Sequence, residues 1–155
     1  MTTVSAIMTR DIFAVRPETD LATTAKLLAD HHISGAPVID AEQRPIGVVT
    51  LTDLADPVRE RSDRLGESKF YYLTERSRSI HWGDGAVTAE GVVADVMSRF
   101  VISIDPDASL QRAAERMLSD DVHRLLVVDK GKLVGVVSSM DIIRGFVQHR
   151  EPGAT

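Results

Sequence analysis

The stretch GVVTLTD at residues 47–53 decides the fold, because the chain repeats it almost unchanged as GVVSSMD at residues 135–141. Each copy contains a glycine, two valines, a hydroxyl residue, two variable residues and an aspartate. Two valines that finish a buried strand, followed by Ser/Thr-x-x-Asp, are typical of a strand that runs directly into a helix. The hydroxyl would cap the first helical turn, and the aspartate would lie favourably in the positive field at the helix N-terminus.

The same polar residues have a second interpretation. A hydroxyl and a carboxylate at a helix N-terminus can together bind a sugar or a phosphate ester. Thr50 and Asp53 in the first copy, and Ser138 and Asp141 in the second, are therefore candidate ligand-binding pairs as well as capping residues. One copy taken alone favours the capping interpretation, so the extent of the repeat matters.

The repeat extends outward from these junctions over most of the chain. Aligning Met8 with Met97 places VSAIMTR (4–10) on VADVMSR (93–99), and a one-residue deletion in the second copy precedes GVVSSMD. The same alignment pairs Pro17 with Pro106, Leu21 with Leu110, Ala25 with Ala114, Val38 with Val127 and Asp40 with Asp129. Because most substitutions replace one apolar residue by another, the chain is an internal duplication.

Each copy predicts the order β-α-β-β-α. In the first copy the segment IFAV (12–15) precedes a helical pattern in LATTAKLLADHH (21–32), two short strands around a polar turn, and the junction into a last helix. In the second copy VISI (101–104) precedes LQRAAERMLSDD (110–121), followed by the same strands and helix. Neither copy is long enough to close its own core. We therefore expect an α/β (α+β) fold in which two repeats pack about a pseudo-twofold axis, leaving two related clefts between them.

The predicted organisation has four parts: a first repeat (1–55), a linker or insertion (56–92), a second repeat (93–150) and a C-terminal tail (151–155). The linker is rich in charge, yet it holds Phe70, Tyr71, Tyr72 and Trp82. Disordered linkers are poor in aromatic residues, so we expect the FYYL segment to dock on the domain or on a partner. Three roles stay open for these rings: covering exposed core, closing a ligand cleft, or forming a dimer contact.

Composition and charge narrow the class of protein. Hydrophobic residues make up 43% and charged residues 26% of the chain, as in an ordinary globular protein. The net charge of −5 argues against sequence-independent nucleic-acid binding, and the absence of cysteine excludes disulfides and thiolate chemistry. No secretory signal or membrane-length apolar run is present. We expect a cytoplasmic protein with neither a membrane nor a nucleic-acid partner.

Catalytic motifs are absent from the sequence. It contains no phosphate-binding P-loop, no dinucleotide-binding glycine motif and no G-x-S-x-G nucleophile elbow. The five histidines form neither an H-E-x-x-H pattern nor a four-ligand metal set: His31, His32, His81, His123 and His149. We therefore predict no enzyme, no catalytic residue, no metal site and no catalytic cofactor.

The duplication, the two G-V-V-[TS]-x-x-D junctions and the strands APVID and LVVD together resemble the CBS-domain pair, also called the Bateman module. The resemblance covers residues 4–55 and 93–148, about two-thirds of the chain. It implies a pseudo-symmetric regulatory unit that homodimerises through its helices and modulates a partner protein. It also implies that clefts between the repeats bind AMP, ADP, ATP or S-adenosylmethionine. A rival function is an interaction module that dimerises without any ligand.

The resemblance also implies roles for particular residues. Asp53 and Asp141 match the aspartate that binds the ribose hydroxyls, while Thr50 and Ser138 match the neighbouring hydroxyl that contacts ribose or phosphate. The adenine region is implied to involve Ser34, Gly35, Ala36 and Pro37 together with Ile102, Ser103 and Ala14, the last of which lacks the hydroxyl of its counterpart Ser103.

The second copy carries a further similarity. VHRLLVVD (122–129) is similar to the last repeat of the gamma subunit of AMP-activated protein kinase, where a His-Arg pair faces the nucleotide phosphates. His123 and Arg124 are thereby implied as phosphate-binding residues. The first copy has Ser34 and Gly35 at these positions and no basic residue, so we expect two non-equivalent clefts. The sequence leaves open which copy supplies the base contacts of a cleft and which copy supplies its ribose contacts.

Overall fold

The computed structural model describes residues 2–55 and 90–149. The aromatic residues Phe70, Tyr71, Tyr72 and Trp82 and the tail 151–155 lie outside the described residues. The expected docking of FYYL and the boundaries of the linker therefore stay predictions.

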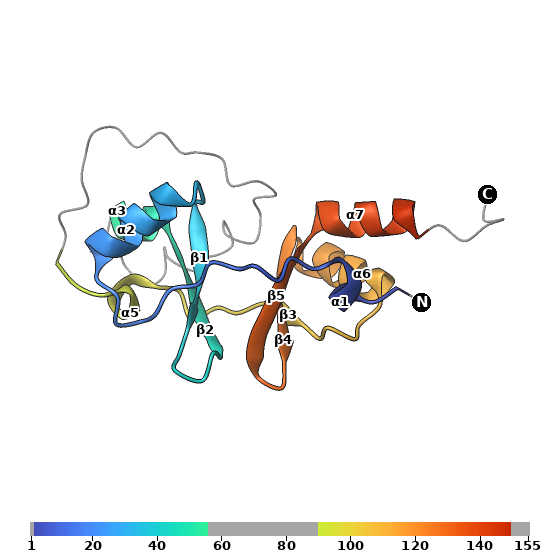
Figure 1. The fold of residues 1–155 in the computed structure, drawn as a ribbon, viewed down its shortest axis with the longest axis horizontal. Helices are drawn as coiled ribbons and strands as arrows, with labels where there is room; N and C mark the ends of the chain where they lie inside the picture. The colour runs from blue at the N-terminus through green and yellow to red at the C-terminus, as the bar shows by residue number, and fades with distance from the viewer. Residues whose placement is uncertain (1, 56–89, 150–155) are drawn as a thin grey trace.

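The described chain forms two halves, each with a small sheet and flanking helices (Figure 1). Antiparallel strands β1 and β2 form one sheet, while in the other β3 lies parallel to β4 and β4 is antiparallel to β5. These elements confirm the α+β class. The second repeat has the predicted order β-α-β-β-α, whereas in the first repeat the expected strand at 12–15 is reduced to one isolated bridge between Val15 and Val38. The first repeat contains α2 (Leu21–Asp30), β1 (Gly35–Ile39), β2 (Pro45–Thr50) and α3 (Leu51–Ala55). The second contains β3 (Ser103–Ile104), α6 (Leu110–Asp120), β4 (Arg124–Asp129), β5 (Lys132–Ser138) and α7 (Ser139–Gln148).

The long helix of each repeat begins at a capping side chain. The Asp20 carboxylate accepts a hydrogen bond from the backbone N–H of Thr23 at 2.7 Å, and the Ser109 hydroxyl accepts one from Arg112 at 3.1 Å. The backbone N–H and then the hydroxyl of Thr23 lower the pKa of Asp20, because both donate to its ionised form. These caps fix where α2 and α6 start and so orient their apolar faces toward the sheets.

Each repeat begins with a short helix that packs on the opposite half. Helix α1 (Val4–Ile7) lies beside α6 and α7, whereas α5 (Val93–Val96) lies beside α2 and β2 (Figure 1). Val4 and Met8 are buried in the core of the second half, and Val93 and Met97 in that of the first. The two repeats therefore exchange their first segments, and each completes the core of the other.

Two pairs of backbone hydrogen bonds hold the exchanged segments in place. Thr9 pairs with Val136 of β5 at 2.8 and 3.0 Å, and Ser98 pairs with Val48 of β2 at 2.8 and 2.9 Å. The glycine beside each pairing position, Gly47 or Gly135, allows the segment to cross closely over the strand. The glycine of the repeated G-V-V sequence thus serves this close approach of two backbones.

Candidate functional site

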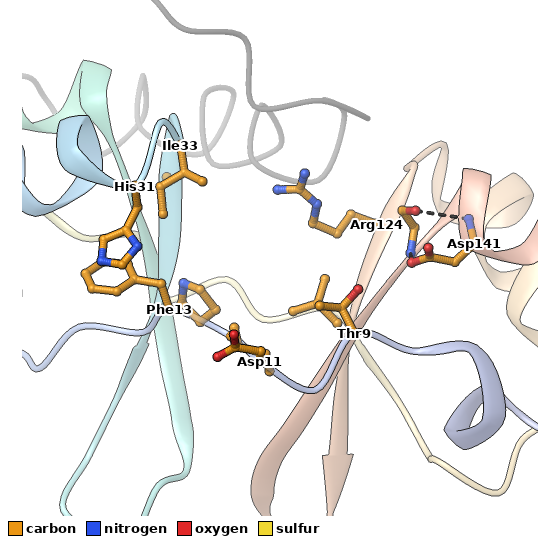
Figure 2. Close-up of a pocket in the computed structure, with 12 residues that line it drawn as sticks. Thr9, Asp11, Phe13, His31, Ile33, Arg124 and Asp141 are labelled. Carbon is orange, nitrogen blue, oxygen red and sulfur yellow. Dashed lines mark hydrogen bonds between the residues drawn. The ribbon is translucent and has the colours of Figure 1, made fainter.

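A cleft of about 370 Å³ lies between the two halves. Figure 2 shows Arg124 and Asp141 of the second repeat on one side and Phe13, His31 and Ile33 of the first repeat on the other. Residues of the first repeat that line the cleft are Thr9, Asp11, Ile12, Phe13, His31, Ile33, Gly35 and Pro37, and those of the second are Arg124, Val136, Ser138 and Asp141. Both repeats therefore build one site.

The junction of the second repeat places its polar pair at the N-terminus of α7. The backbone N–H of Ser138 donates to Asp141 Oδ2 at 2.9 Å, and the N–H of Asp141 donates to the Ser138 hydroxyl at 3.1 Å. Asp141 Oδ1 lies 3.6 Å from the Arg144 guanidinium, and the carboxylate remains partly exposed at the cleft. The two side chains thus cap α7 and still present oxygen atoms to the cleft.

The junction of the first repeat has the same geometry in a different environment. The N–H of Thr50 donates to Asp53 Oδ2 at 2.9 Å, and the N–H of Asp53 lies 3.4 Å from the Thr50 hydroxyl. However, Thr50 is only 2% exposed and Asp53 only 4% exposed, and neither lines the cleft. Capping is therefore the role that the structure gives this pair, and its predicted contact with ribose stays a prediction.

The structure separates the two basic residues that the sequence placed at the phosphate. Arg124 lines the cleft and extends across it (Figure 2). His123 instead lines an apolar groove between α6 and α7. Arg124 is thus the one of the two that the structure places at this cleft, and the predicted phosphate contacts of both residues stay predictions.

The predicted adenine-binding residues also divide between different places. Gly35 and Pro37 line the cleft, whereas Ala36 is buried in the same strand and Ser34 is buried immediately before it. Ala14 is half-buried and does not line the cleft. Ile102 belongs to the core of the second half, and Ser103 lines a separate depression beside α6. Of the residues predicted for the adenine region, only Gly35 and Pro37 line this cleft, and their contact with a base stays a prediction.

Sequence reasoning missed several residues of the cleft. Thr9, Asp11, Ile12, Phe13 and Ile33 come from segments without polar motifs, and their position depends on the exchange of the first segments. His31 is named from the sequence only among the five histidines that form no metal set. In the structure its ring stacks on Phe13 with the centroids 4.3 Å apart and the planes at 26°. A flat aromatic pair therefore forms part of the wall on the first-repeat side.

Two negative findings concern the described residues. No group of three or more His, Cys, Asp or Glu side chains within 2–55 and 90–149 could hold a metal ion. No helix in this part of the chain has the length and apolar character needed to cross a membrane.

Comparison with known proteins identifies the class. Residues 4–60 and 93–148 match the CBS domain, so the chain belongs to the CBS domain family, as a pair of such domains. It is similar to CBSX2 from Arabidopsis thaliana, solved in complex with AMP, with 26% identity and a TM-score of 0.67, covering 97% of this chain and 100% of that one.

Two further similarities extend the comparison. The CBS domain pair of protein MJ0100, solved with 5'-methylthioadenosine and S-adenosyl-L-methionine, shares the fold at 22% identity and a TM-score of 0.62, covering 97% and 99% of the two chains. Protein MJ1232 of Methanocaldococcus jannaschii is 29% identical over 136 residues, which are 87% of this chain and 36% of that protein. The chain thus spans about a third of this relative's length.

Proposed function

We propose that the chain is a regulatory module that binds one adenine nucleotide of the AMP type in the cleft between its repeats. The observation that carries this proposal is the convergence of Arg124, Ser138 and Asp141 from the second repeat on Gly35 and Pro37 from the first. The complex of the similar CBSX2 with AMP supports the ligand class. A volume of about 370 Å³ lies within the range of small-ligand pockets.

Three groups of residues in the cleft match the three parts of a nucleotide, which are the ribose, the phosphate and the base. The ionised Asp141 carboxylate would accept hydrogen bonds from the ribose hydroxyls, which are stronger when the acceptor is charged. The guanidinium of Arg124 offers several fixed donors to a phosphate. Phe13 and His31 would lie on the side of the base. S-adenosylmethionine, the alternative adenosine ligand, carries a sulfonium cation in place of a phosphate, and Arg124 favours the anionic ligand.

One ligand per chain follows from the difference between the two junctions. Asp141 is partly exposed at the cleft, whereas Asp53 is buried together with Thr50. An aspartate with almost no exposed surface gives the ribose no access. We therefore assign binding to the cleft that contains the Asp141 junction.

Replacing Arg124 with alanine tests the nucleotide assignment. We expect the Kd for AMP to rise about tenfold, because a charge-assisted hydrogen bond to the phosphate is lost, while the Kd for adenosine changes little. Isothermal titration calorimetry with both ligands measures this difference. Arg144→Ala is the matched control, since Arg144 lies 3.6 Å from Asp141 but does not line the cleft. Equal losses for AMP and adenosine would remove the phosphate role of Arg124.

We further propose that the chain forms a homodimer through α6 and α7. Helix α7 exposes Ile143, Phe146 and Val147 at the i, i+3, i+4 spacing of a helix-packing stripe, and Leu118 of α6 is 83% exposed beside it. A stripe of this kind on a surface helix is self-complementary about a twofold axis, which favours a second copy of the chain as its partner. The cleft and the stripe share α7, so a ligand at its N-terminus can influence the dimer surface.

Ile143→Asp should convert the dimer into a monomer, because the interface would bury an unpaired charge. Size-exclusion chromatography with light scattering at several protein concentrations measures the mass. Phe100→Asp introduces the same charge at another exposed apolar position, outside α6 and α7, and should leave the mass unchanged. A wild-type monomer at all concentrations would exclude this dimer. A stable dimer that binds no adenine nucleotide would instead favour the ligand-independent interaction module.

A further inference from the structure

The two β-hairpins of the chain touch at their turns. The backbone N–H of Leu133 in β5 donates a hydrogen bond to the carbonyl oxygen of Gln43, in the turn before β2, at 2.9 Å. Among the described residues, this is the one backbone hydrogen bond that joins the β1–β2 hairpin directly to the β4–β5 hairpin. A Cβ added to Gly131 in the other turn would lie 3.9 Å from the Arg44 side chain, which is an ordinary van der Waals distance. The turns of the two repeats are therefore in contact.

The turn of the first hairpin holds Gln43 in an unusual backbone conformation. Gln43 has a φ of 64°, in the left-handed region that a residue with a side chain seldom adopts. The Asp40 carboxylate accepts hydrogen bonds from the backbone N–H groups on either side, of Glu42 at 3.0 Å and of Arg44 at 2.9 Å. These bonds maintain a conformation that is costly by itself. The carbonyl of this strained residue is the one that bonds to the other hairpin.

The hairpin contact and the cleft lie on opposite sides of the exchanged segments. In β5 the contact is at Leu133, and the exchanged segment pairs three residues later, at Val136. The cleft starts at Val136 and extends to Ser138 at the end of the strand. In the first hairpin the contact at Gln43 likewise comes before the pairing at Val48. Figure 1 shows the turns at the lower end of the sheets and the helices at the upper end, with the exchanged segments crossing between them.

This arrangement makes each half a lever that turns on the exchanged segments. At about 3.3 Å per residue, the arm from Val136 to Leu133 is about 10 Å long and the arm from Val136 to Ser138 about 7 Å long. Narrowing the cleft by about 1 Å at Ser138 would therefore separate the turns by about 1.5 Å. The N–O distance of 2.9 Å would then exceed the range of a hydrogen bond, about 3.2 Å. The hairpin contact accordingly sets the greatest width of the cleft.

We propose that the contact between Gln43 and Leu133 is a latch, which holds the cleft at its widest and opens when a ligand draws the two walls together. This inference rests on the proposed nucleotide binding and assigns the conformational response of the chain to it. A ligand that contacts Arg124 and Asp141 on one wall and the first repeat on the other favours a narrower cleft, because hydrogen bonds act only at about 2.7–3.2 Å. Ligand and latch therefore favour different states, and each weakens the other by the same factor.

Amide hydrogen exchange of the wild-type chain, followed by NMR with and without saturating AMP, tests the latch directly. The N–H of Leu133 should exchange about tenfold faster with AMP, because it loses its acceptor. A ligand that stabilises the folded state normally slows exchange, so acceleration at this position is specific to the latch. The N–H of Leu126, which donates to Ile102 within the second half at 3.0 Å, is the matched control and should not accelerate.

Locking the latch with a disulfide provides the converse test. The chain has no cysteine, so Gln43→Cys combined with Leu133→Cys introduces a single cysteine pair. The hydrogen bond of 2.9 Å brings the two Cα atoms to within about 7 Å of each other, the limit for a disulfide. The oxidised variant should bind AMP at least about tenfold more weakly than the same variant reduced, because the state that the ligand favours becomes inaccessible. Titration of thiols verifies the bond.

The outcomes separate the latch from nucleotide binding. AMP binding by calorimetry with unchanged or slower exchange at Leu133 would overturn the latch and leave the proposed function intact. Equal AMP affinity of the oxidised and reduced double variant would overturn the latch as well. The exchange experiment needs no variant, so it decides the inference even if the cysteine pair does not oxidise. Absence of AMP binding to the wild-type chain would overturn the proposed function and, with it, the coupling to the latch.

Discussion

Replacing Gly47 with alanine is expected to destabilise the chain by about 1–3 kcal/mol, the usual range for overpacking a filled site. A Cβ at position 47 would overlap the carbonyl oxygen of Ser98, which accepts a hydrogen bond from Val48 at 2.8 Å. The obstacle is a backbone atom of the exchanged segment, so relief requires that the segment move away from β2. Urea unfolding measures the loss as a lower transition midpoint at an unchanged slope.

Gly135→Ala is the matched comparison in the other repeat. There the nearest atom to the added Cβ is the sulfur of Met8 at 2.5 Å, at the end of a flexible side chain, and the Thr9 carbonyl oxygen lies farther away at 3.1 Å. A methionine side chain can rotate away at low cost, so the loss should be smaller than at Gly47. Equal stability losses in the two variants would show that the backbone crossing at Ser98 is not what requires the glycine.

Replacing Asp141 with asparagine is expected to weaken AMP binding about 10- to 100-fold, equivalent to about 1–3 kcal/mol. The asparagine oxygen can still accept the hydrogen bond that Ser138 donates to the aspartate at 2.9 Å, so the cap of α7 persists. What disappears is the negative charge that strengthens hydrogen bonds from the ribose hydroxyls. Titration calorimetry with AMP measures the change, and thermal unfolding verifies the fold.

Asp53→Asn makes the same substitution at the equivalent position of the first repeat. Asp53 also accepts a backbone hydrogen bond at 2.9 Å, but it is buried and does not line the cleft. The AMP affinity of the Asp53→Asn variant should therefore stay within about twofold of the wild-type value, a difference of about 0.4 kcal/mol in binding free energy. An effect on AMP binding as large as that of Asp141→Asn would contradict the assignment of one ligand to one cleft.

The capping residues illustrate what could be predicted from sequence and why. Ser138 and Asp141 lie three residues apart, and their reciprocal hydrogen bonds depend only on the local geometry of a helix start. The same local rule correctly gave Thr50 and Asp53 the same arrangement. The rule takes no account of burial by distant residues, so it could not distinguish the partly exposed pair from the buried one.

The sequence by itself determined the duplication, the α-β-β-α order that the two copies share, and the capped junction that ends each sheet. All of these depend on periodicity and spacing within a short stretch of chain. Only the tertiary structure decided that α1 and α5 pack on the opposite halves, that Arg124 and not His123 faces the cleft, and that Phe13 and Pro37 lie across from Asp141. The physical reason is the duplication itself. VSAIMTR and VADVMSR carry the same apolar pattern and could complete either core, so a short stretch of sequence cannot say which core each one joins. In the structure the exchange is held by the long-range pairing of Thr9 with Val136 and of Ser98 with Val48.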